Sequence, residues 1–121
     1  MVTVPGFLLR RLYVKGSLMN SPEGVQFQLK NTLGTGYARA MLPVALDETE
    51  YPLGKAFFNV DGALVSFASV NDTSRFTIPL NKVITILVKG ASLAPGTHKM
   101  TMGFVVPGLG QLRFDVKDEI K

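Results

Sequence analysis

Residues 97–116 read THKMTMGFVVPGLGQLRFDV, and this stretch decides the fold class. Both halves place large apolar side chains at every second position: Met100, Met102, Phe104, Val106, Leu112, Phe114 and Val116. A period of two puts such side chains on one face of a β-strand. The intervening Pro107-Gly108-Leu109-Gly110 has the residue types of a tight turn. The stretch therefore predicts an antiparallel hairpin with one buried face.

Similar patterns extend in both directions from this hairpin. We expect further strands at 12–18, 25–31, 37–46, 57–60, 63–70, 75–80 and 83–88. Residues 83–88 are apolar on both faces, which predicts a central strand covered from either side. Asp61-Gly62 predicts a hairpin turn, and 47–55 an irregular loop. The chain is thus predicted to be all-β, a single two-layer antiparallel β-sandwich, immunoglobulin-like, with about seven to nine short strands.

Composition limits the class of protein. The chain has 121 residues, 46% of them hydrophobic and 18% charged, which suits one hydrophobic core. We expect a single domain over 1–121, with 1–11 as an N-terminal arm. Because the chain has no cysteine, disulfides and thiolate metal sites are excluded, and a cytoplasmic location is expected.

Charge and hydropathy exclude other classes of partner. The net charge is +4, but the 13 basic residues are mostly scattered singly, so no nucleic-acid-binding face is predicted. No apolar run approaches the roughly 20 residues that span a bilayer. The short apolar stretch Phe7-Leu8-Leu9 precedes Arg10 and Arg11, the reverse of a secretory signal. We therefore expect neither a nucleic-acid partner nor a membrane span.

Catalytic equipment is sparse. His98 is the one histidine, and a strand-end ring that bonds to the backbone is the simplest interpretation of it. Asp47, Glu48 and Glu50 crowd one loop, but their spacing matches no calcium-binding loop. We expect no metal, no cofactor and no catalytic residue, and a chain that is not catalytic alone. An enzymatic hypothesis based on His98 and the acidic loop stays open.

The N-terminal stretch is the strongest candidate for partner binding. Phe7, Leu8 and Leu9 stand beside Arg10 and Arg11, where strand periodicity is lost. Exposed apolar side chains beside arginine are typical of protein interfaces, and Leu109 at the hairpin turn would extend such a patch. The alternative is an arm that packs on its own sandwich.

Three pieces in order, residues 24–29 (GVQFQL), 60–62 (VDG) and 93–98 (LAPGTH), resemble the small β subunit of C-glycoside deglycosidases. The resemblance implies a β-sandwich that pairs with a larger metal-dependent barrel subunit, which carries the chemistry on the sugar. In that family an aromatic and arginine-bearing segment follows the second strand. Tyr37 and Arg39 stand at the corresponding place, and the resemblance implies that they face substrate or partner.

Two functions from different classes follow from these observations. The first is a non-catalytic accessory or assembly subunit, bound to another protein subunit or to itself, that assists a sugar-processing enzyme. The second is a self-contained module that binds a small ligand or a sugar. Tyr37, Arg39 and His98 are candidate substrate- or partner-facing residues. A homo-oligomeric structural protein is a further alternative.

Overall fold

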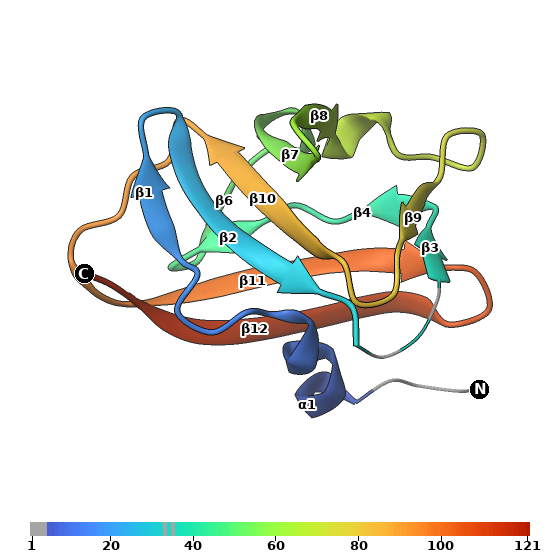
Figure 1. Cartoon of the computed structure of the whole chain (residues 1–121), viewed down its shortest axis with the longest axis horizontal. Coiled ribbons are helices and arrows are strands. Elements are labelled where there is room, and N and C mark those ends of the chain that lie inside the picture. The colour runs from blue at the N-terminus through green and yellow to red at the C-terminus, as the bar shows by residue number, and fades with distance from the viewer. Residues whose placement is uncertain (1–4, 33, 35) are drawn as a thin grey trace.

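The structure is a computed structural model that describes residues 5–32, 34 and 36–121. These residues form twelve strands in three antiparallel sheets (Figure 1). The first sheet has the order β1–β2–β10–β7–β8, with bounds Met19–Ser21, Gly24–Lys30, Val83–Lys89, Ala56–Val60 and Ala63–Ser66. The second has the order β12–β11–β5–β6, with bounds Gly110–Ile120, Gly96–Val106, Ala45–Leu46 and Thr49–Glu50; β4 (Ala40–Met41) also pairs with β11. The third consists of β3 (Gly36–Ala38) and β9 (Phe76–Ile78).

The predicted hairpin is confirmed as the longest element of the fold. β11 and β12 pair along their whole length, with Met102 opposite Phe114 and Phe104 opposite Leu112. These four side chains are buried, so the period-two pattern marks the face that meets the first sheet. In Figure 1 the hairpin crosses beneath β1, β2 and β10, and the core lies between the two layers.

The first sheet contributes the other half of the core. Val25 and Phe27 of β2, and Ile86 and Val88 of β10, are completely buried and belong to the same core cluster as the hairpin residues. β10 lies between β2 and β7, so its prediction as a central strand is confirmed. At the predicted turn between β7 and β8, Asp61 and Gly62 both have positive φ, of 51° and 89°.

The strand expected at 12–18 is wrong. Leu12 ends a short 3-10 helix, η1 (Arg10–Leu12), and Tyr13 makes one isolated bridge to Leu29. The chain then turns: the Ser17 amide donates to the Val14 carbonyl, and Gly16 has a φ of +84°. The alternation there includes Gly16, which has no side chain to bury and readily adopts the positive φ of a turn.

The middle of the chain is more divided than expected. The single strand predicted at 37–46 falls into parts of β3, β4 and β5. The predicted loop at 47–55 contains β6 and the 3-10 helix η2 (Leu53–Lys55), and another 3-10 helix, η3 (Phe67–Ser69), follows β8. The prediction of an all-β antiparallel sandwich is confirmed, whereas seven to nine strands was too low a number because these breaks create very short ones.

The N-terminal arm is helical where it is described. α1 (Gly6–Leu9) runs into η1 and lies against β12 (Figure 1). Residues 1–4 of the predicted arm lie outside the described residues. No helix among the described residues is long and apolar enough to cross a membrane.

Candidate functional site

The single histidine does meet a carboxylate. The β5–β6 turn consists of Asp47 and Glu48, both at positive φ, and it brings the Asp47 carboxylate to Nδ1 of His98. The other carboxylate oxygen of Asp47 accepts the Lys99 amide at 2.9 Å. On the far side of the ring, Nε2 of His98 lies 2.6 Å from the Ala94 carbonyl oxygen. The ring therefore joins the β5–β6 turn to the loop before β11.

Both partners of the His98 ring can only accept hydrogen bonds. Only the imidazolium form donates from both nitrogens, so this arrangement favours the charged ring. Accordingly, the hydrogen bond to Asp47, and then that to Ala94, raises the pKa of His98 above its ordinary 6.5. The Lys99 amide and His98 lower the pKa of Asp47. A histidine with both nitrogens occupied has no free nitrogen with which to accept a substrate proton, so this pair serves as a structural clamp.

A second polar cluster lies next to it. Asp118 is directly opposite His98 in the β11–β12 register, and it accepts the Tyr13 hydroxyl at 2.5 Å and the Gly16 amide at 2.7 Å. Burial, and then the hydrogen bond to Asp118, raises the pKa of Tyr13. Burial opposes ionisation of Asp118, but hydrogen bonds from Tyr13 and from backbone amides outweigh it and lower the Asp118 pKa. This cluster fixes the 13–16 turn to the end of β12.

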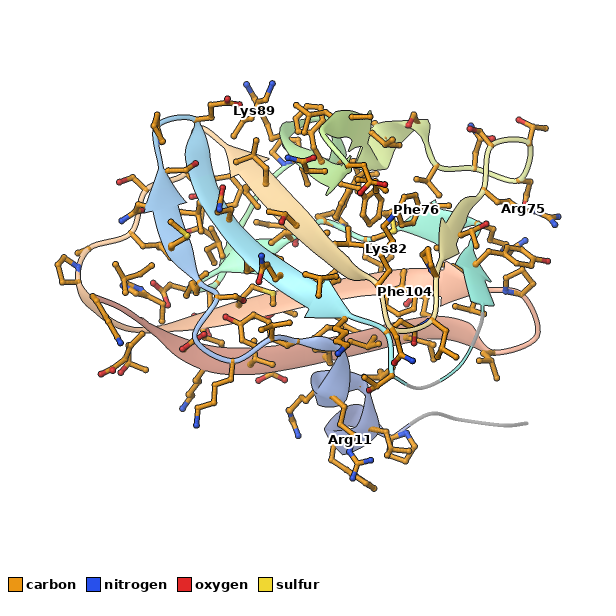
Figure 2. All side chains as sticks on the ribbon, viewed as in Figure 1. Arg11, Arg75, Phe76, Lys82, Lys89 and Phe104 are labelled. Atoms are coloured by element: carbon orange, nitrogen blue, oxygen red, sulfur yellow. The ribbon has the colours of Figure 1, made fainter. Side chains whose placement is uncertain are left out.

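Some side chains of the N-terminal arm contact the sandwich, and others point to solvent. Leu9 is only 2% exposed, and Arg10 donates to the Asp115 carbonyl at 2.9 Å, so these two residues anchor the arm. Phe7 is 64% exposed. Arg11 points away from the sandwich (Figure 2), and Leu8 is half-buried. Of the five predicted contact residues in the arm, Leu9 is buried, and Arg10 is exposed but bound to Asp115; Phe7, Leu8 and Arg11 are the other accessible ones.

The remaining sequence-predicted residues lie elsewhere. Leu109 packs partly against the core at the β11–β12 turn. Tyr37 accepts a hydrogen bond from Arg75 at 3.1 Å, and the Arg75 guanidinium lies 4.8 Å from the centre of its ring. Arg39 pairs with Asp72 at 3.5 Å. The structure thus gives Tyr37 and Arg39 partners within the chain and joins neither of them to His98.

Two open grooves follow the outward face of β11 and β12. One encloses about 510 Å³, with Glu48 and Glu50 on one side, Arg113 and Asp115 on the other, and Lys99 and Thr101 between. A neighbouring groove of about 440 Å³ is lined by Arg10, Tyr13, Lys15, Asp115, Val116 and Lys117. Among the described residues no cluster of histidine and carboxylate side chains is arranged to hold a metal ion.

The interior offers much less space. A cavity of about 20 Å³ lies between the sheets beside Phe76 and Phe104, which both point into the core (Figure 2). Such a volume holds about one water molecule at most. A ligand of any size would therefore have to bind on the surface.

The exposed apolar side chains on the outward face of the first sheet are a feature that the sequence did not predict. Met19, Leu64 and Val83 are 49%, 44% and 46% exposed, and all three point away from the core. Residues 83–88 are apolar on both faces of the strand, and this pattern predicts that other parts of the protein cover both faces. In the structure the inward side faces the second sheet, whereas on the outward side Leu87 is buried and Val83 is exposed.

A comparison with known protein families gives a match. The family model described as hydroxymethylglutaryl-CoA reductase, N-terminal domain, matches residues 8–121. No curated protein matches the chain.

This match overturns the resemblance to C-glycoside deglycosidases. The pieces that carried the resemblance are local β-structure: residues 24–29 form most of β2, residues 60–62 lead through a tight turn, and residues 93–98 enter β11. Strand and turn patterns of this kind recur in unrelated antiparallel sheets, so they do not identify a family. The implied pairing with a sugar-cleaving barrel subunit is withdrawn with it.

Proposed function

Because the chain belongs to the family of hydroxymethylglutaryl-CoA reductase N-terminal domains, we propose that it is a non-catalytic docking domain that binds the catalytic part of such a reductase. Phe7 carries this proposal: a large aromatic side chain, 64% exposed, on an arm that is fixed in place. Aromatic residues and arginine are enriched in the centres of protein interfaces. Arg11, close to Phe7 on the same arm, supplies the arginine.

The anchoring of the arm supports the same role. Leu9 is buried against the sandwich and Arg10 is held by Asp115, so Phe7 and Arg11 are presented without first ordering a flexible segment. Preorganisation of this kind lowers the entropy cost of binding. One core cluster includes residues from the arm and both large sheets, which supports treating 1–121 as a single domain.

Sedimentation velocity of the chain mixed with a purified catalytic part of the reductase from the same organism tests the proposal. A complex should form, and replacing Phe7 and Arg11 together by alanine should weaken it about tenfold or more, as expected for loss of an interface anchor. Arg113→Ala, an exposed arginine of β12, is the control and should leave the affinity unchanged. Absence of any complex would refute a docking role.

A second candidate function is a small-ligand module, favoured by the groove between Glu50 and Arg113. Its lining carries both carboxylates (Glu48, Glu50, Asp115) and cations (Lys99, Arg113), which suits a polar ligand with both donor and acceptor groups. Titration of the isolated chain with glucose and with hydroxymethylglutaryl-CoA tests this alternative. A rise in melting temperature that Arg113→Ala abolishes would favour the module over the docking domain.

A further inference from the structure

The groove between the N-terminal arm and β12 carries an excess of positive charge. We call it the basic groove, and it encloses about 440 Å³. Arg10, Lys15 and Lys117 contribute three cations to its lining, and Asp115 is the one carboxylate among the lining residues. Because Arg10 already pairs with Asp115 at 3.8 Å, the charges of the two lysines are left over.

The fold holds these two lysines beside each other. Asp118 follows Lys117 on β12, and its carboxylate accepts the Gly16 amide and the Tyr13 hydroxyl. These bonds tie the turn that carries Lys15 to the strand that carries Lys117. Both lysines are exposed, and within the part of the chain that the structure describes neither has a carboxylate within ion-pair distance.

A third lysine adds to the positive charge. Lys99 of β11 is directly opposite Lys117 in the β11–β12 register. Like charges at such positions repel, so the arrangement costs stability in the isolated chain. An anionic group bound beside Lys117 would offset this repulsion. The charges therefore favour an occupant that brings carboxylates to the groove.

We propose that the basic groove binds an acidic segment of the catalytic part of the reductase. The inference rests on the proposed docking function and names the chemistry that the arm and its surroundings recognise. Arg10 belongs to the arm and also lines the groove, so the groove adjoins Phe7 and Arg11. An apolar contact at Phe7 flanked by ion pairs at the two lysines has the anatomy of an interface, with an anchor and a polar rim.

Other anionic occupants fit the groove less well. A phosphate group is often held by converging backbone amides, but the Gly16 amide already donates to Asp118. A single-stranded nucleic acid needs exposed aromatic rings on which its bases stack, whereas Tyr13 is half-buried and packs against the core. A second copy of the chain could offer only its acidic 47–50 loop, and such a head-to-tail contact does not close into a dimer.

Charge reversal tests the proposal on the complex with the catalytic part of the reductase. Replacing Lys15 and Lys117 together by glutamate should weaken binding about tenfold or more, because attractive pairs become repulsive. The affinity of the wild-type chain should also fall as the salt concentration rises, and the variant should lose this dependence. The melting temperature of Lys117→Glu alone should stay level or rise, because the repulsion from Lys99 is removed. A loss of affinity then cannot come from unfolding.

The matched control replaces Lys55 and Lys89 by glutamate, which changes the net charge by the same amount. Figure 2 shows Lys89 and Arg11 on opposite sides of the molecule. Lys55 precedes Ala56, which is opposite Val88 in the sheet, so Lys55 lies close to Lys89 and far from the arm. The control should change the affinity less than about twofold, because only the groove lysines meet the partner.

The outcomes separate the two proposals. A complex that tolerates the change of Lys15 and Lys117, yet loses affinity when Phe7 and Arg11 are replaced, overturns this inference and leaves the docking function intact. Absence of any complex refutes both. If the complex tolerates the change while inorganic phosphate raises the melting temperature of the wild-type chain alone, the groove is a small-anion site and the inference is overturned. A wild-type chain that self-associates in isolation, and becomes monomeric when the two lysines are replaced, would also overturn it.

Discussion

The two outward faces of the sandwich differ in their amino-acid composition. On β12 the outward positions hold Gln111, Arg113, Asp115, Lys117 and Glu119, so every second residue suits water. On β10 the outward positions are Val83, Thr85, Leu87 and Lys89, so apolar and polar residues alternate there. One fold thus carries one outward face that is polar along its length and one on which apolar and polar side chains alternate. The difference shows that exposed apolar side chains are tolerated on a sheet when polar neighbours separate them.

The largest expected effect separates the two sides of β10. Ile86→Ala should lower the free energy of unfolding by about 2–5 kcal/mol, because it leaves a cavity in a closed core. Leu87→Ala should lower it by only about 1–2 kcal/mol in the isolated chain, because Leu87 lies on an outward face where neighbouring side chains and water can fill the gap and no closed cavity forms. Urea unfolding monitored by circular dichroism measures both values. Equal losses would show that the outward face is already covered within the chain.

A smaller effect concerns pH. The raised pKa of His98 means that its contribution to stability is complete below the ordinary value of 6.5 and is lost as pH rises through the folded-state pKa. The lowered pKa of Asp47 means that its contribution is present above 3.8 and is lost as pH falls through its own folded-state value. The clamp is therefore strongest between these two limits.

His98→Gln tests the clamp. The wild-type chain should lose stability as pH rises from about 6 to about 9, and the variant should show a flatter profile in that range. The chain has one histidine, so no other imidazole confuses the comparison. Thermal unfolding at several pH values provides the measurement, and parallel profiles for the two proteins would rule the clamp out.

The smallest effect concerns the solvent face of the second sheet. Lys99 and Lys117 are directly opposite each other in the β11–β12 register. Like charges at such positions repel, so Lys117→Glu should stabilise the chain by about 0.2–1 kcal/mol. The gain should shrink at high salt because exposed charges are screened. Chemical denaturation at low and high ionic strength checks this, and a destabilised variant would contradict the assignment of this face to solvent.

The parts of the fold that the sequence predicted are those with strict local patterns. β11 and β12 follow the period of two over long stretches, and Asp61-Gly62 specifies its own turn. The incorrect predictions concern structure that depends on contacts between residues far apart in the sequence. Asp47 and Glu48 form a tight turn at positive φ without glycine. The Asp47 carboxylate holds this turn by accepting hydrogen bonds from the Lys99 amide and the His98 ring, which no local pattern reveals.

The candidate sites were only partly predictable for the same reason. The exposure of Phe7 and Arg11 agrees with their unusual place in the sequence, although contact with a partner stays a prediction. Whether Leu9 and Arg10 would face inward could not be known without the helical arm and its contact with β12. The exposure of Val83 could not be predicted, because an apolar pattern over residues 83–88 predicts cover on both sides and does not show which residues flank the strand.

Protection of single cysteines tests most directly the claim that the N-terminal arm is the part of the chain that docks. The chain lacks cysteine, so Leu8→Cys on α1 and Thr101→Cys on β11 each provide one thiol, the first beside Phe7 and the second on the outward face of the second sheet. In the complex with the catalytic part of the reductase, alkylation at position 8 should slow about tenfold while that at position 101 stays unchanged, because an interface core excludes water. Unchanged alkylation at position 8, or protection at position 101 instead, would contradict the account.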